Sequence, residues 1–284
     1  MEKYKKLINP QNTIEFIKKN EFTFKKRFGQ NFLIDERVLN KIMDGADITK
    51  EDSVLEIGPG IGTMTQALCE RAGEVTAVEI DRDLIPILNE TLSVFDNVRI
   101  INEDVLKLDL NSISDKPLKV VANLPYYITT PIVMELFESG ARLESVTVMV
   151  QKEVADRMQA VPGGKDYGAL SLAVQYYAEA EVIANVPPNC FIPRPGVGSA
   201  VINLKCHKEK PVCPQNEEYM FRLIKAAFAQ RRKTLLNALK NDSSLNLSKE
   251  KIQEVFSELG IDERIRGEKL SLADFAALSD RFLK

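Results

Sequence analysis

The sequence predicts an α/β fold with a mostly parallel sheet, followed by a small all-helical C-terminal domain. From residue 53 to 160, short apolar segments typical of strands alternate with segments of helical spacing, which is the order of βαβ units. The apolar segments lack polar alternation, as expected when both faces of a sheet are buried. After residue 216 only helical spacing remains.

The elements of the sheet region follow from this alternation. Two helices, 13–19 and 35–46, are expected before the first strand. The expected strands are 53–57, 74–80, 97–105, 118–124 and 145–150. The expected helices are 63–72, 82–92, 130–139 and 151–160, with Pro86 capping or kinking the second and Pro131 in the first turn of the third.

The last third of the chain changes character. A helix and a strand are expected within 169–186, then a Pro/Gly-rich loop at 187–198 and a closing hairpin strand at 198–206. The polar, proline-bearing residues 207–216 are the best linker candidate. Helices are expected over 217–240, 248–260 and 271–284, with Ser248 and Ser271 as N-caps and Gly260 as a stop. The predicted domains are therefore 1–206 and 207–284.

Composition places the chain among ordinary globular proteins, with 284 residues, 44% of them hydrophobic and 28% charged. No apolar run is long enough to span a membrane, and the charged N-terminus does not resemble a secretory signal, so a cytoplasmic location is expected. The four cysteines form no CxxC pair and His207 is the single histidine, which argues against a zinc site and for reduced thiols.

Positive charge is clustered although the net charge is −3. Residues 1–27 carry eight basic and three acidic side chains, and Arg231, Arg232 and Lys233 form a second group in a stretch of helical spacing. Each group alone is most simply a solvated face. Together, in a protein with other features of nucleobase binding, they favour a polyanionic partner.

A glycine-rich turn follows the first strand, in the segment LEIGPGIGTMT. Its Gly58, Gly60 and Gly62 allow a tight turn and a close approach to a ligand, but the G-x-G-x-G spacing disfavours NAD. Glu79 ends the second strand and Asp104 ends the third. Because ligands bind at the carboxyl ends of strands in open α/β sheets, these residues together predict an edge that binds adenosine.

The fourth strand runs into Asn123, Leu124, Pro125, Tyr126 and Tyr127. A turn is the simplest interpretation, because Asn and Pro both favour turns. The alternative is a pocket for a flat ring that bears an amino group. The Asn123 amide oxygen and a backbone carbonyl can accept hydrogen bonds from an exocyclic amine, and Tyr126 offers a face on which a base can stack.

These motifs resemble those of the ribosomal RNA adenine N6,N6-dimethyltransferase family, of the KsgA/RsmA type. The similarity covers about residues 22–275 in unchanged order. Its blocks include FGQNFLID, VLEIGPGIGTMT, NLPYYITTPIV, YGALSLAVQYY, FIPRPGVGSAVI and FAQRRKTLLNAL. The resemblance implies a Rossmann-like, class I fold of S-adenosylmethionine-dependent methyltransferases, with a mostly parallel seven-stranded sheet. It also implies S-adenosylmethionine as the cofactor and no metal.

The resemblance also assigns site residues. Asn31 and Leu33 would lie over the cofactor, Gly58 and Gly60 would contact it, Glu79 would bind its ribose and Asp104 its adenine amine. Asn123 would sit between the cofactor and the target base, with Asn123, Leu124 and Tyr126 as the catalytic group. Tyr126 and Phe191 would cover the two faces of the target adenine, and Arg231, Arg232 and Lys233 would contact RNA. Where the family pattern predicts Lys after PRP, this chain has Gly196, which puts one phosphate contact in doubt.

Three functions fit the resemblance. The first is dimethylation of two adjacent adenines in a hairpin loop near the 3′ end of 16S rRNA, by a monomer acting on the 30S subunit or its precursor during ribosome biogenesis. The second is dimethylation of one adenine in 23S rRNA, which confers antibiotic resistance. The third is an RNA-binding assembly factor with a vestigial site. The intact residues Gly58, Glu79, Asp104, Asn123 and Tyr126 favour a catalyst.

Overall fold

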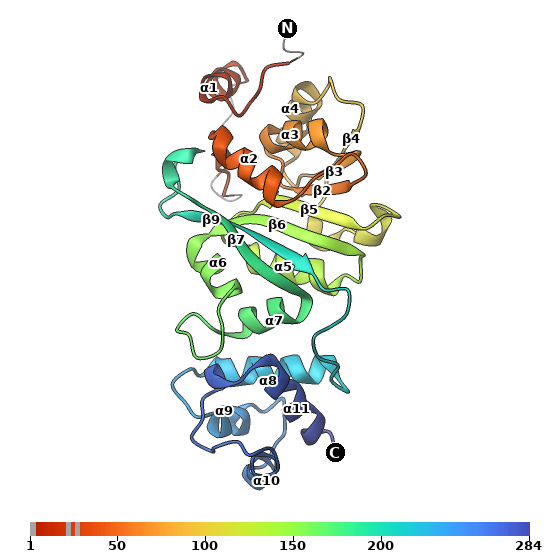
Figure 1. Cartoon of the computed structure of the whole chain (residues 1–284). Coiled ribbons are helices and arrows are strands. Elements are labelled where there is room, and N and C mark those ends of the chain that lie inside the picture. Colours follow the sequence, from red (N-terminus) through yellow and green to blue (C-terminus); the bar gives the residue numbers. More distant parts are fainter. Residues whose placement is uncertain (1–3, 21–23, 26–28) are drawn as a thin grey trace. The chain divides into compact units, whose positions relative to one another are not determined.

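A seven-stranded sheet of order β4-β3-β2-β5-β6-β9-β7 forms the centre of the sheet-containing part of the chain (Figure 1). The computed structural model describes residues 4–20, 24–25 and 29–284. The strands are β2 (Ser53–Ile57), β3 (Glu74–Val78), β4 (Val98–Ile101), β5 (Leu118–Asn123), β6 (Leu143–Gln151), β7 (Ala178–Val186) and β9 (Ser199–Cys206). The pairs among β2 to β6 are parallel, and β9 is antiparallel to β6. The sequence prediction of a mostly parallel sheet is confirmed.

Helices cover both faces of this sheet (Figure 1). The helices of this part are α1 (Pro10–Lys19), α2 (Glu36–Gly45), α3 (Thr63–Arg71), α4 (Ile85–Thr91), α5 (Thr129–Glu138) and α6 (Lys152–Met158). Every residue of β2 is buried, because the strand lies at the centre of the sheet. Helix α2 begins where the Asp35 carboxylate accepts hydrogen bonds from the backbone N–H groups of Arg37 and Val38.

A second, two-stranded sheet has no signal in the sequence. Strand β1 (Phe32–Leu33) pairs antiparallel with β8 (Phe191–Ile192), so that Leu33 lies opposite Phe191. This ladder joins the segment before α2 to the Pro/Gly-rich loop. It fixes residues 32–33 beside the carboxyl ends of the central strands.

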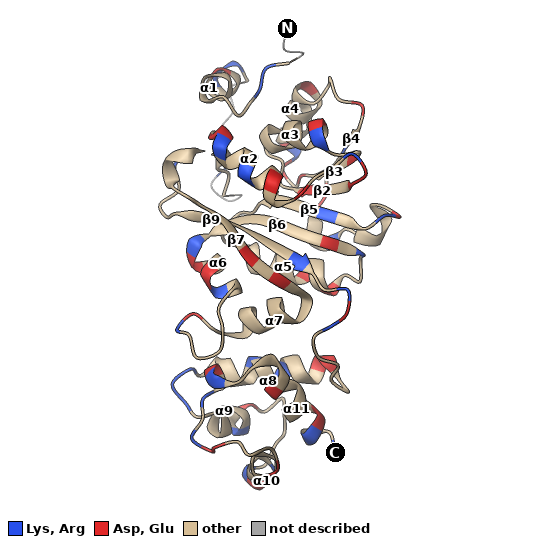
Figure 2. Cartoon of the chain, viewed as in Figure 1, with Lys and Arg blue, Asp and Glu red and all other residues tan. Residues whose placement is uncertain are grey.

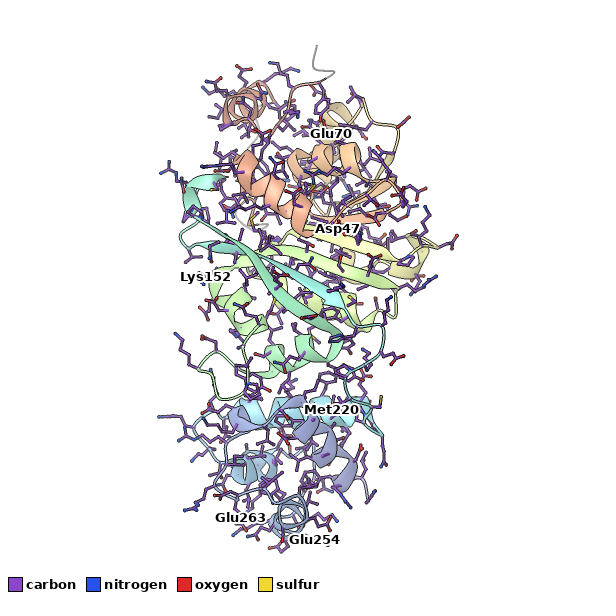
Figure 3. All side chains as sticks on the ribbon, viewed as in Figure 1. Asp47, Glu70, Lys152, Met220, Glu254 and Glu263 are labelled. Atoms are coloured by element: carbon purple, nitrogen blue, oxygen red, sulfur yellow. The ribbon has the colours of Figure 1, made fainter. Side chains whose placement is uncertain are left out.

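The C-terminal helices form their own core. They are α8 (Glu217–Ala229), α9 (Leu235–Asn241), α10 (Lys249–Leu259) and α11 (Leu272–Phe282). Ser248 and Ser271 cap α10 and α11 through their side chains, and Gly260 ends α10 with a left-handed φ of 66°, as predicted. Met220 of α8 is fully buried in this core (Figure 3).

The first of the predicted C-terminal helices differs from the structure. The predicted helix 217–240 is broken between Ala229 and Leu235, so Arg231, Arg232 and Lys233 lie in a loop and not in a helix. The chain also groups into two compact units, residues up to Ala155 with Glu181–Cys206, and Asp156–Ala180 with His207–Lys284. The second unit includes α7 (Ala169–Tyr177) because its Leu172 and Tyr176 share the core of the C-terminal helices. The functional division at residue 206 stays a prediction.

Candidate active site

A cavity opens at the carboxyl ends of β2, β3 and β5, where the sequence predicts the adenosine edge. Its walls come from the segment before α2, the glycine-rich turn, the ends of the strands and the turn after β5. It is lined by Gly29, Gln30, Asn31, Phe32, Leu33, Glu56, Gly58, Gly60, Glu79, Ile80, Glu103, Asp104, Asn123, Leu124, Tyr126 and Tyr127, among others. All the predicted cofactor residues therefore meet at one site.

The glycine-rich turn needs glycine for two different reasons. Gly58 has a φ of 68°, a left-handed backbone conformation that favours glycine. A Cβ atom there would meet nothing within 4 Å, so the space beside Gly58 at the cavity is open. Gly60 has a φ of 62°, and a Cβ atom would lie 2.9 Å from the Phe32 ring. The second position therefore lets the aromatic ring of Phe32 rest on the turn.

The Glu79 carboxylate is buried directly after β3, with 5% of the residue exposed. One oxygen accepts a hydrogen bond from the backbone N–H of Asp81 at 2.7 Å, and the other accepts from Gly60 at 3.3 Å. Burial raises the pKa of Glu79 above its ordinary value, and these two donors oppose that effect. The side chain is thus held as a fixed acceptor at the cavity wall.

Asp104 lies three residues beyond the end of β4, where its carboxylate caps a short 3₁₀ turn by accepting from Leu106 at 3.1 Å. The sequence pattern predicted that Asp104 ends the strand itself. Asp104 nevertheless lines the cavity. Asp104 is therefore available to a ligand at this edge.

The Asn123 side chain has a fixed orientation. Its Nδ2 donates a hydrogen bond of 2.8 Å to the backbone carbonyl of Asn31. Because a carbonyl oxygen can only accept, the amide nitrogen must face Asn31 and the amide oxygen must face away from it. Asn123 thus keeps an acceptor for another group at the cavity.

The next two predicted residues are also held in place. The N–H of Leu124 donates to the Met149 carbonyl at 3.1 Å, and Pro125 has no N–H, so the backbone turns here without a free donor. The Tyr126 hydroxyl lies 2.7 Å from the Ser199 hydroxyl of β9. The ring of Tyr126 is therefore anchored at its far end while it lines the cavity.

Phe191 is not at the cavity. Its residue exposure is 1%, and it belongs to the hydrophobic core that includes Leu33, Ile42 and Val201. It is absent from the cavity lining because the β1–β8 ladder turns it into the core. In this structure only Tyr126 of that pair lines the cavity, and the role of Phe191 at the target base stays a prediction.

Some basic side chains form hydrogen bonds or ion pairs within the protein, and others are exposed. Arg231 donates to the backbone carbonyls of Lys165 and Tyr167, whereas Arg232 and Lys233 are exposed in the same loop between α8 and α9 (Figure 2). In the N-terminal group, Lys5 pairs with Glu15, Lys19 with Glu90 and Lys25 with Asp81. Lys3, Lys26 and Arg27 lie outside the described residues. The positive charge of the N-terminal group is thus partly neutralised.

Other residues line the cavity although the sequence motifs did not point to them, among them Gln30, Phe32, Glu56 and Ile80. Ile80 is a large apolar residue with 52% exposure, and its place directly after Glu79 was the available signal. Phe32 and Gln30 belong to the FGQNFL segment, of which only Asn31 and Leu33 were assigned.

Among the described residues no group of His, Cys, Asp and Glu is arranged to hold a metal. No described helix has the length and apolar character of a membrane span.

Glu56 is a fully buried carboxyl in β2, and neither oxygen has a partner in hydrogen-bond geometry. Burial, opposed by the nearby Thr65 hydroxyl and reinforced by the Glu79 carboxylate, raises the pKa of Glu56 to about 8. A group whose pKa is higher in the folded state favours folding while it is protonated. Its contribution is therefore complete below the ordinary pKa of 4.5 and is lost as pH rises through about 8.

We expect Glu56→Gln to remove this pH dependence. The raised pKa corresponds to a cost on the order of 4 kcal/mol near pH 8, since the shift from 4.5 to about 8 is multiplied by about 1.4 kcal/mol per unit. The variant should therefore exceed the wild type in free energy of unfolding near pH 8 and approach it near pH 5. Urea denaturation of the cofactor-free protein across this range measures the difference. Equal pH slopes for the two proteins would contradict a neutral Glu56.

The fold and the site together define a class I S-adenosylmethionine-dependent methyltransferase. Two solved structures of this class are similar to the chain. A dimethyladenosine transferase from Plasmodium falciparum is 26% identical with a TM-score of 0.75, and the match covers 87% of this chain and 95% of that one. The 23S rRNA methyltransferase ErmE is 25% identical with a TM-score of 0.68, and the match covers 89% of this chain and 100% of that one.

The chain belongs to the ribosomal RNA adenine dimethylase family, whose sequence profile matches residues 21–284. Proteins called ribosomal RNA small subunit methyltransferase A are close relatives. The one from Lachnoclostridium phytofermentans is 62% identical, with 96% of each chain covered, and the one from Clostridioides difficile is 51% identical, with 94% of each covered. The family resemblance seen in the sequence is confirmed, and the protein is an S-adenosylmethionine-dependent rRNA adenine methyltransferase.

Proposed function

We propose that this protein dimethylates N6 of two adjacent adenines in a hairpin loop near the 3′ end of 16S rRNA. It acts as a cytoplasmic monomer on the 30S subunit or its precursor. The names of its relatives support a small-subunit target. The observation that carries the chemistry is the fixed amide of Asn123, which keeps an oxygen acceptor at the cavity beside the anchored ring of Tyr126.

The residues of the cavity fit S-adenosylmethionine. The open space at Gly58 and the buried acceptor Glu79 suit a ribose and the chain attached to it, with Glu79 accepting from the hydroxyls. Asp104 accepts from the adenine amine of the cofactor. Gly60, Asn31, Leu33 and Asn123 complete the surface that encloses it. When bound, this cofactor supplies an activated methyl group on a sulfonium.

Two hydrogen-bond acceptors in the turn after β5 orient the target amine. An adenine amine is a poor nucleophile because its lone pair is delocalised into the ring. The Asn123 amide oxygen and the Leu124 carbonyl accept its two hydrogens, which draws the nitrogen towards tetrahedral geometry and stabilises the positive charge that develops on it. Tyr126 stacks on the extruded base and offsets part of the cost of unstacking it.

The proton balance needs no strong base. In the first transfer the N–C bond would form as the S–CH3 bond breaks, with the electron pair staying on the sulfur as a neutral thioether. Both hydrogens of the amine are then still attached and held by Asn123 and Leu124, whereas one is left to hold in the second transfer. The excess proton leaves to solvent once the N–C bond exists. Orientation of the amine by these two acceptors is therefore the main contribution of the chain to the rate.

Arg232 and Lys233 are the exposed cations best suited to phosphates, and Arg231 fixes the start of their loop. Contacts of this kind position an RNA and make its binding dependent on salt. The sequence-specific part of recognition then falls to the cavity, which admits an unpaired adenine.

We expect Gly196→Lys to strengthen rRNA binding. A Cβ atom at Gly196 meets nothing within 4 Å, so the larger residue fits without a clash. An added surface cation should raise affinity about two- to fivefold and steepen the salt dependence by about one counterion. Filter binding of 16S rRNA over a salt series measures both, with Gly196→Ala as the neutral control. Equal salt slopes for the Lys and Ala variants would exclude a phosphate at this loop.

The proposed function is tested by transfer of a tritiated methyl group from S-adenosylmethionine. We expect incorporation into 30S particles that lack the modification and little into naked 16S rRNA or into 50S particles. Reverse-transcription stops should fall at two adjacent adenines of 16S rRNA. Stops in 23S rRNA would favour the resistance activity, and absence of transfer and of thermal stabilisation by the cofactor would favour a vestigial site.

A further inference from the structure

Asp81 is a buried carboxylate that the proposed chemistry does not use. Its side chain is 2% exposed, although it lies in a loop that follows β3. Three donors compensate for its burial: Lys25 Nζ at 2.7 Å, Gln30 Nε2 at 3.1 Å and the backbone N–H of Asp83 at 3.2 Å. Two of the three come from the chain before the sheet, more than fifty positions earlier.

Lys25 and Gln30 are also joined to each other. The backbone N–H of Lys25 donates to the Gln30 side-chain oxygen at 2.9 Å, while the amide nitrogen of Gln30 donates to Asp81. The Gln30 amide thus has both of its ends engaged. Burial of Asp81 makes these bonds stronger than exposed ones, because water does not compete for the carboxylate.

Asp81 connects this group to the cofactor wall. Its own backbone N–H donates to Glu79 at 2.7 Å, the carboxylate assigned to the ribose. Directly after Gln30, the Asn31 carbonyl accepts from Asn123, and Phe32 rests on Gly60. Residues 30–32 are therefore fastened to Asp81 at one end and to the Asn123 side of the cavity at the other.

We propose that Asp81 is a positioning residue, whose ion pair with Lys25 and hydrogen bond to Gln30 hold residues 30–32 against the bound cofactor. Release of this contact frees the segment and opens a route for the cofactor to leave. The pair therefore sets the affinity and residence time of the cofactor, whereas the methyl-transfer step depends on Asn123. The inference rests on the proposed place of the cofactor in this cavity.

The test compares Asp81→Asn and Lys25→Met with the wild type in RNA-free protein. Calorimetric titration with S-adenosylhomocysteine should show about tenfold weaker binding in each variant, within the usual range for coupled sites. Stopped-flow dissociation should be faster by a similar factor. In methylation assays on 30S particles with saturating cofactor, kcat should change less than twofold, while KM for the cofactor rises. Lys25→Arg should restore tight binding.

Three controls separate this role from a general loss of stability. Lys19→Met removes an exposed ion pair with Glu90, whose length of 2.9 Å is close to the 2.7 Å of the pair between Lys25 and Asp81. It should leave cofactor affinity unchanged. Asp83→Asn removes the exposed second partner of Lys25 and should have the smaller effect. The double variant Asp81→Asn/Lys25→Met should lose less affinity than the two single losses combined, because both single variants remove the same ion pair.

Wild-type affinity in Asp81→Asn and Lys25→Met would overturn the inference, as would a fall in kcat with unchanged affinity. Each of these results leaves the proposed function intact, because the wild-type protein would still bind the cofactor and methylate RNA. Failure of the wild type to bind S-adenosylhomocysteine, or binding that Glu79→Ala does not alter, would instead remove the proposed place of the cofactor.

Discussion

Asn123→Ala should lower turnover on 30S particles by about 10²–10³-fold, the range seen when one preorganised hydrogen-bonding group is lost at a reacting centre. The amide oxygen accepts from the target amine most strongly as positive charge develops there, so its loss raises the barrier more than it weakens binding. Tritium transfer under saturating cofactor and RNA measures the effect. Binding of S-adenosylhomocysteine should persist.

Asn123→Asp provides the matched control. It keeps an oxygen acceptor but loses the Nδ2 donor to Asn31, so a carboxylate would face the Asn31 carbonyl. We expect activity between those of the wild type and the alanine variant, with a weaker hold on residues 30–32. Wild-type turnover in Asn123→Ala would show that the amine is not oriented by this amide, and the mechanism would need another acceptor.

Glu79→Ala should weaken cofactor affinity about a hundredfold. The carboxylate offers charged acceptors to two ribose hydroxyls, and hydrogen bonds to charged groups contribute about 1.5–3 kcal/mol each. The substitution also leaves the N–H groups of Gly60 and Asp81 without their partner. Calorimetric titration with S-adenosylhomocysteine measures the loss, and thermal unfolding without cofactor reports any change in the fold itself.

The pH dependence of binding gives a second readout for Glu79. Because burial raises its pKa, the carboxylate is protonated at a higher pH than an ordinary glutamate. Affinity for the cofactor should therefore be complete at high pH and decline as pH falls through this raised pKa. Glu79→Gln should bind weakly at every pH without this decline. An unchanged profile in Glu79→Gln would remove Glu79 from the ribose site.

The local elements of the fold were predictable because their signals are local. Four of the five strands predicted from 53 to 150 were found within two residues of their final ends, since burial on both faces leaves unbroken apolar runs. The predicted strand 97–105 is shorter in the structure, because β4 lies at the edge of the sheet, is partly exposed and ends at Ile101. The caps Ser248 and Ser271 and the stop at Gly260 were found because capping depends on a few neighbouring residues. The break at 230–234 was missed because the apolar spacing on both sides continues in helical register.

The site divides in the same way. Gly58, Glu79, Asp104 and Asn123 each follow a strand or its end, so their common edge follows from the parallel order of the sheet. The position of Phe191 depends on its pairing with Leu33, which is 158 residues earlier, and no local pattern reports that pairing. A ring expected over the target base therefore lies in the core.

By itself, the sequence determined the class of fold, the edge at which the ligand binds and the family. These depend on the alternation of strands and helices along the chain and on the spacing of motifs, and both can be seen in the sequence. Only the tertiary structure decided which atom of the Asn123 amide faces Asn31 and which is left for the cavity. It also decided that Asp81 accepts hydrogen bonds from Lys25 and Gln30, and that α7 packs in the C-terminal core. Each of these depends on contacts between residues far apart in the chain. Such contacts are chosen by packing and hydrogen bonding of the whole fold, and not by any local preference.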